Sequence, residues 1–182
     1  MKNVLIPLAP GFEEIETITV VDILRRSGAR VSTAGIVDGI IEGSRGVKLF
    51  ADESINNINS ENFDLMVLPG GQPGTDNLKK DPRVTTLLNE MYSKKKLIGA
   101  ICAAPIILEE NGLLIKRKRT SHPSVKEILS CDLYKEERVV VDQNIITSRS
   151  PGTAMEFTFK LVEILFGVDR VLLVNKGVLA NI

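Results

Sequence analysis

The chain has 182 residues, 43% of them hydrophobic, which suits one domain, residues 1–182, around one well-buried core. Lysine plus arginine and aspartate plus glutamate each number 23, and this balance makes a nucleic-acid partner unexpected. No apolar stretch approaches the length of a membrane span, and the first residues lead into an expected strand rather than a signal peptide. We therefore expect a cytoplasmic protein with no membrane partner.

Taken in order, the chain opens with a β-α-β pattern. Residues 3–8 are an apolar run expected to form a first strand, and residues 30–35 are expected to form a second. Residues 13–26 between them have the spacing of an amphipathic helix. Residues 40–50 are typical of a hairpin with a glycine turn, and residues 64–68 are expected to form a further core strand.

The second half repeats the alternation of helix and strand. We expect helices over 82–94, from just after Cys102 to Gly112, and over 153–166, and strands over 97–101, 119–121, 139–141 and 145–148. The tail carries another apolar run, 171–174, whose structure we leave open. Strands that alternate with helices predict a three-layer α/β/α sandwich with a mostly parallel sheet.

Cys102 stands between an expected strand and an expected helix, with small residues two before and two after it, Ala100 and Ala104. A nucleophile elbow requires small flanks because its turn is too sharp for bulky ones. The helix N-terminus beyond the turn would favour a thiolate. The alternative is that Cys102 is simply a small buried hydrophobic residue.

Two other segments are expected near the carboxyl ends of the strands, where such sheets bind ligands. Acidic residues at 13, 14 and 16 begin the first helix, where they either complement the helix dipole or turn one carboxylate toward Cys102. The loop after residue 68 contains Gly70-Gly71 and lacks a phosphate-loop ending. It is either an ordinary turn or a source of backbone N–H groups for developing charge.

The remaining titratable residues narrow the choice of chemistry. The one histidine, His122, must serve any Cys–His or Ser–His pair within the chain, and a site of several histidines is excluded. We expect neither a metal nor a cofactor. Cys131 lies in a polar segment without a motif and is interpreted as a bystander thiol. The basic residues 116–119 are interpreted as a solvated loop rather than a nucleic-acid or targeting patch.

Five motifs resemble the ThiJ/PfpI family, and within it the DJ-1 branch that includes a parkinsonism-associated deglycase. The resemblance covers nearly the whole chain and implies a flavodoxin-like fold and a homodimer. In chain order the motifs are Ala9-x-Gly11-x-Glu13-Glu14-x-Glu16, Val67-Leu68-Pro69-Gly70-Gly71, Ala100-Ile101-Cys102-Ala103-Ala104-Pro105, Thr120-Ser121-His122-Pro123 and Thr147-Ser148-Arg149-Ser150-Pro151-Gly152-Thr153.

The resemblance also implies roles for individual residues. Cys102 matches the family nucleophile, and Glu16 matches the carboxylic acid that meets its sulfur. His122 matches a nearby histidine, expected within reach but not always in good dyad geometry. The backbone N–H groups of Gly71 and Ala103 match an anion-stabilising pair.

Arg45 and Arg26 match the family less closely and are expected at a dimer-facing substrate pocket.

Two activities of related proteins are not expected here, because this chain lacks the catalytic base that each of them uses. PfpI-type peptidases have Cys-His-Gly at the elbow, whereas Cys102 is followed by two alanines. Class I glutamine amidotransferases use a downstream His-x-Glu, whereas Pro123 and Ser124 follow His122.

Two functional classes therefore stay open. The resemblance implies a cofactor-independent glyoxalase or deglycase that converts methylglyoxal to lactate and removes its early adducts through Cys102. The alternative is a non-catalytic, redox-responsive protective or chaperone-like protein that is switched by oxidation of the same cysteine. Both classes need the thiolate, so the sequence alone does not separate them.

Overall fold

The computed structural model describes residues 1–129 and 131–180, and the side chain of Cys131 lies outside what it describes. A seven-stranded sheet in the order β5-β2-β1-β6-β7-β9-β8 forms its centre. Its strands are β1 (Asn3–Leu8), β2 (Arg30–Gly35), β5 (Glu53–Ser54), β6 (Leu65–Leu68), β7 (Leu97–Ile101), β8 (Val139–Asp142) and β9 (Ile145–Ser148). Neighbouring strands are parallel, except for the antiparallel pair β8 and β9. The hairpin of β3 (Ile40–Glu42) and β4 (Lys48–Phe50) stands apart from this sheet.

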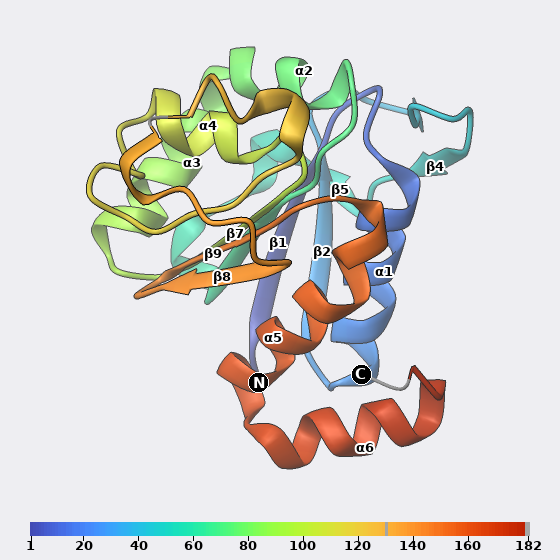
Figure 1. Ribbon diagram of the computed structural model, residues 1–182. Coiled ribbons are helices and arrows are strands. Elements are labelled where there is room, and N and C mark those ends of the chain that lie inside the picture. The colour runs from blue at the N-terminus through green and yellow to red at the C-terminus, as the bar shows by residue number, and fades with distance from the viewer. Residues whose placement is uncertain (130, 181–182) are drawn as a thin grey trace.

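Helices cover both faces of the sheet (Figure 1). One layer contains α1 (Glu14–Arg26) and α5 (Ala154–Phe166), and α6 (Val168–Val178) packs against α5. The other layer contains α2 (Gly74–Lys80), α3 (Pro82–Ser93) and α4 (Pro105–Glu110). The predicted three-layer α/β fold with a mostly parallel sheet is confirmed.

The central strands are apolar on both faces because each face packs against helices. In β1, Leu5 points into the hydrophobic cluster beneath α3 and α4, whereas Val4 and Ile6 point into the cluster beneath α1 and α5. A strand buried on both sides gains stability from every apolar side chain, which explains the nearly unbroken hydrophobic runs in the sequence.

The structure differs from the sequence-based expectation at residues 74–80 and 116–121, and it shows the structure of the tail, which the sequence left open. Residues 74–80 form α2, which was not expected, and the apolar run in the tail belongs to α6. Residues 119–121 form no strand; Arg119 makes a single bridge with Tyr134. Arg119 is also not solvated, since only 2% of it is exposed and its Nη1 donates to the carbonyls of Leu114 and Arg117.

The outer edge of β2 is capped by side chains. Its neighbour β5 pairs with β2 only at Ala34 and Gly35. Beyond that short pairing, the Thr33 N–H donates to Asp52 Oδ2 at 2.8 Å, and the Val31 carbonyl accepts from Arg25 Nη2 at 3.1 Å. Arg25 and Asp52 also form an ion pair at 2.8 Å. Within the described ranges, no helix is long and apolar enough to cross a membrane.

Candidate functional site

Cys102 occupies a sharp turn directly after β7. Its φ is 64°, a left-handed conformation that costs a non-glycine residue on the order of 1–3 kcal/mol. Two hydrogen bonds hold it there: Cys102 N–H donates to the Ser148 carbonyl at 3.0 Å, and its own carbonyl accepts from His122 N–H at 2.8 Å. The strained turn is therefore fixed from the end of β9 on one side and from residue 122 on the other, as a nucleophile elbow requires.

The chain leaves the elbow directly into a short helix. Ala104 is its N-cap and Pro105 its first residue, a position where proline costs no hydrogen bond. Ala100 and Ala104 are both fully buried, so larger side chains at these two positions would have to displace their neighbours. The small flanks in the sequence thus have a packing reason in the structure.

Glu16 lies in the first turn of α1 and is fully buried. The Glu13 carboxylate accepts its backbone N–H at 2.7 Å and so caps the helix. The Glu16 carboxyl accepts the Gly70 N–H at Oε2, 2.8 Å away, and hydrogen-bonds the Cys102 side chain. Burial raises the pKa of Glu16 to about 7, although these hydrogen bonds act against the rise.

Gly70 is the residue that sequence reasoning missed as an individual position. A Cβ atom at this glycine would lie 2.7 Å from Cys102 Cβ and 2.7 Å from Glu16 Oε2. Only a glycine therefore allows the loop after β6 to pass between these two side chains. The signal was the Gly70-Gly71 pair directly after a buried strand, which was interpreted only as a possible source of N–H groups.

The environment of the Cys102 sulfur pulls its pKa in two directions. Burial and the neighbouring Glu16 carboxylate raise the pKa of the thiol, whereas the backbone N–H groups of Ala103 and Gly71 lower it. The net direction is upward, contrary to the expectation that the helix N-terminus alone would favour a thiolate. Two neighbouring anions repel each other, so ionisation of one group raises the pKa of the other. Glu16 and Cys102 must therefore titrate as a pair.

His122 reaches the elbow through its backbone. Its N–H holds the Cys102 carbonyl, while its ring Nδ1 lies 2.7 Å from Ser124 Oγ and accepts the Ser124 N–H at 3.2 Å. The side chain thus caps a 3₁₀ turn at Pro123–Val125. The structure brings His122 next to the nucleophile, but it records these ring contacts with Ser124 rather than with the sulfur.

The two arginines are not brought together with the cysteine. Arg26 ends α1, ten residues and therefore about 15 Å beyond Glu16 along the helix, where it pairs with Asp22 at 2.8 Å. Within one chain it is too far away to reach Cys102. Arg45 lies in the turn between β3 and β4, where its N–H donates to the Glu14 carboxylate at 2.6 Å and its side chain is exposed.

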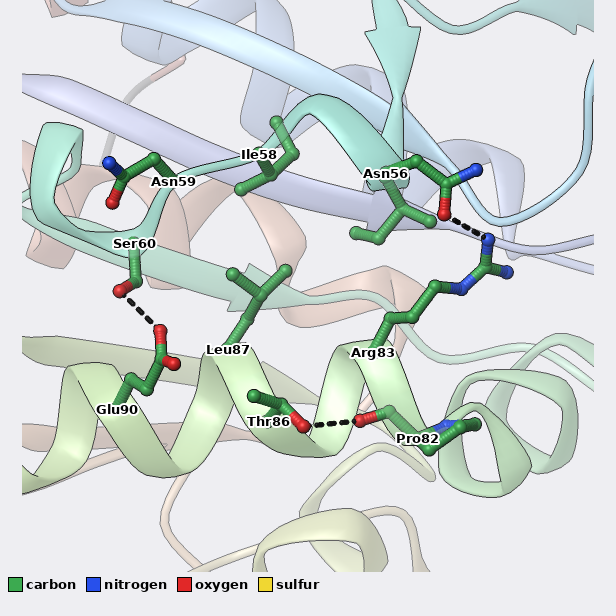
Figure 2. Close-up of a pocket in the computed structure, with 10 residues that line it drawn as sticks. Asn56, Ile58, Asn59, Ser60, Pro82, Arg83, Thr86, Leu87 and Glu90 are labelled. Atoms are coloured by element: carbon green, nitrogen blue, oxygen red, sulfur yellow. Dashed lines mark hydrogen bonds between the residues drawn. The ribbon is translucent and has the colours of Figure 1, made fainter.

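A cavity of about 490 Å³ lies away from the elbow, between α3 and the segment before β6 (Figure 2). Its charged lining groups are already engaged: Arg83 pairs with Asp81 and donates to Asn56, and Glu90 accepts from Ser60 Oγ at 2.6 Å. No cysteine or histidine lines it. The candidate chemistry therefore belongs to the elbow and not to this cavity.

Fold and elbow together define a flavodoxin-like α/β protein whose strained cysteine follows a central strand. Residues 2–164 match the model of the DJ-1/PfpI family, and the chain belongs to that family. This confirms the family resemblance that the five motifs indicated.

Three similar proteins illustrate the relationship. "Protein DJ-1 homolog A" of Arabidopsis thaliana is 43% identical over 97% of this chain, which spans only 46% of that protein's length. "Glutathione-independent glyoxalase DJR-1.2" of Caenorhabditis elegans is 37% identical over 93% of this chain and 91% of its own. The solved structure "Toxoplasma gondii DJ-1, oxidized" superposes with a TM-score of 0.95 at 36% identity, covering 98% of each chain.

Proposed function

We propose that the protein is a cofactor-independent glyoxalase that converts methylglyoxal to lactate and, by extension, removes early methylglyoxal adducts from protein or nucleotide groups. The observation that carries the proposal is the contact between the Cys102 side chain and a fully buried Glu16 whose pKa is about 7. A nucleophile beside an acid that exchanges its proton near neutral pH is what an intramolecular redox isomerisation needs. One similar protein is itself named a glyoxalase.

In the proposed reaction, Cys102 Sγ attacks the aldehyde carbon of methylglyoxal. A C–S bond forms, and the carbonyl π electrons move to oxygen. The N–H groups of Gly71 and Ala103, which already act on the sulfur, are the donors for this oxyanion. Glu16, which holds the shared proton, gives it to this oxygen; the product is a hemithioacetal attached to Cys102, and Glu16 is left as a carboxylate.

The next step moves hydrogen between adjacent carbons. Glu16 removes the proton from the former aldehyde carbon, giving an enediol, and returns a proton to the neighbouring carbon. The hemithioacetal becomes a lactoyl thioester without any external oxidant or reductant. Water then cleaves the thioester, releasing lactate and restoring the thiol.

The proposal is tested by lactate production from methylglyoxal with purified protein. The Cys102→Ser variant should lose at least about a hundredfold in turnover, because a serine hydroxyl ionises far less readily than a thiol. Cys131→Ser is the matched control and should keep the wild-type rate. Turnover by Cys102→Ser comparable to that of wild type would remove Cys102 as the nucleophile.

A redox-responsive role is the second candidate, because the same amides suit an oxidised sulfur. A sulfinate at Cys102 would accept hydrogen bonds from Gly71 and Ala103, each charge-assisted bond being worth about 1.5–3 kcal/mol. Mild peroxide should therefore add two oxygen atoms to Cys102, as located by peptide mapping and mass spectrometry. Addition to Cys131 instead would contradict this role.

We also propose that the protein is cytoplasmic and that it forms a homodimer.

A further inference from the structure

The side chain of His122 is held by its neighbour Ser124 in a way that fixes which ring nitrogen carries hydrogen. The Ser124 backbone N–H donates to Nδ1 at 3.2 Å. A backbone N–H has no lone pair to offer, so Nδ1 must supply one. The Ser124 hydroxyl, 2.7 Å from the same nitrogen, can turn to donate as well.

A neutral imidazole carries its single hydrogen on one nitrogen and a lone pair on the other. Since the lone pair of Nδ1 faces Ser124, the hydrogen is on Nε2. A general base must present a lone pair to the proton that it removes. In this arrangement Nε2 has none, and the one on Nδ1 is engaged by the 3₁₀ turn that His122 caps.

We propose that His122 serves the site as a hydrogen-bond donor through Nε2–H, and that Ser124 is the positioning residue that fixes this tautomer. The main chain keeps the residue beside the nucleophile, because His122 N–H is bonded to the Cys102 carbonyl at 2.8 Å. From this position, an Nε2–H directed toward the elbow would stabilise charge that develops on a substrate oxygen. Proton transfer between the two carbons then falls to Glu16 alone.

This inference rests on the proposed function for its catalytic consequence, but its structural core can be tested without turnover. His122 is the chain's one histidine, so the imidazole nitrogen signals of ¹⁵N-labelled protein need no assignment. At a pH where the ring is neutral, a two-bond ¹H–¹⁵N correlation spectrum should show a protonated Nε2 and an unprotonated Nδ1. A protonated Nδ1 would overturn the proposal, whatever the activity.

Two substitutions separate a donor from a base. His122→Asn can keep an acceptor near the Nδ1 position and so preserve the cap, but it has no atom at Nε2. His122→Gln reaches the Nε2 position with an amide N–H donor and cannot act as a comparable base. We expect Asn to lose about ten- to a hundredfold in kcat and Gln to retain within about tenfold of wild type.

Equal, severe losses in both variants would contradict the donor role and restore the base. Unchanged kcat in His122→Asn would contradict it too, because the donor would then be dispensable. Thermal melts of both variants check that the 3₁₀ turn is intact.

Ser124→Ala removes the hydroxyl but keeps the backbone donor, so the Nε2–H tautomer should persist in the spectrum of this variant. A switch to the Nδ1–H tautomer would contradict control by the Ser124 backbone N–H. If wild type makes no lactate, the proposed function fails while the spectrum still reports on the tautomer.

Discussion

Gly70 packs directly against Glu16: the glycine N–H donates to the carboxyl at 2.8 Å, and a Cβ at Gly70 would approach Glu16 Oε2 to 2.7 Å. The same Cβ would approach Cys102 Cβ equally closely. The distance between acid and nucleophile is therefore set by the absence of a side chain at position 70.

Gly70→Ala should separate the pair. The methyl group must push Cys102, Glu16 or the loop aside, at a cost of about 1–3 kcal/mol in the free energy of unfolding and about a hundredfold in methylglyoxal turnover. Gly152→Ala is a suitable control, because the nearest atom to its added Cβ is 3.9 Å away. Denaturant melts and lactate assays measure the two effects. A Gly70→Ala protein with wild-type turnover would show that this close fit is not needed.

The buried Glu16 should make stability depend on pH. Its pKa is about 7 in the folded protein and about 4.5 in the unfolded chain, so the folded state holds a proton that the unfolded state has lost between these values. The contribution is fully present below pH 4.5 and declines as the pH rises to about 7, by on the order of 3 kcal/mol. Glu16→Gln cannot titrate, so the difference in unfolding free energy between the two proteins isolates this effect. A difference that does not change between pH 4.5 and 7 would contradict it.

The fold could be predicted from the sequence more fully than the site could. Continuous apolar runs such as residues 3–8 identify strands buried on both faces, because no other environment rewards such a pattern. Helix α2 begins with Gly74-Thr75 and lacks a side-chain cap, so its start carries no local signal. Arg119 was misinterpreted because a basic run is usually solvated, whereas here nearby backbone carbonyls accept its donors.

Within the site, spacing predicted the elbow but not the balance of charges around it. The flanks of Cys102 indicate a sharp turn whatever the surroundings. Whether its thiol pKa rises or falls depends on burial and on Glu16, which is 86 residues away in sequence. The tautomer of His122 likewise depends on how Ser124 is oriented, which no residue pattern specifies.

Glu16→Gln should reveal which member of the pair holds the shared proton. Within the described ranges, Glu16 Oε1 is buried without a hydrogen-bond partner, so an ionised carboxylate would leave charge there without a donor. We therefore place the proton on Glu16 when Cys102 is a thiolate. At pH 6, below the Glu16 pKa of about 7, alkylation of Cys102 by iodoacetamide should then stay within about threefold of wild type, since a neutral amide replaces a neutral acid, while turnover falls at least about a hundredfold. A more than tenfold faster alkylation would place the proton on the sulfur instead.

The apolar surface over α1 and β4 should join two copies of the chain. Ile15, Ile18 and Phe50 are 57%, 47% and 70% exposed, and Ile18 and Phe50 line the same shallow cavity. Burying them would remove enough apolar area to favour association. Sedimentation should show a dimer at micromolar concentration and a monomer for Ile18→Glu. Leu173→Glu, at a similarly exposed position on α6, should leave the dimer intact. A monomeric wild type would refute the proposed dimer.

The capped edge of β2 limits how copies of this protein can meet. An extended strand arriving from another molecule needs free N–H and C=O groups to continue the sheet. At this border the Thr33 N–H and the Val31 carbonyl are already bonded to Asp52 and Arg25, and those two side chains form an ion pair as well. An incoming strand would have to break all three contacts before gaining one. Extension of the sheet along this part of β2 is therefore blocked by two side chains.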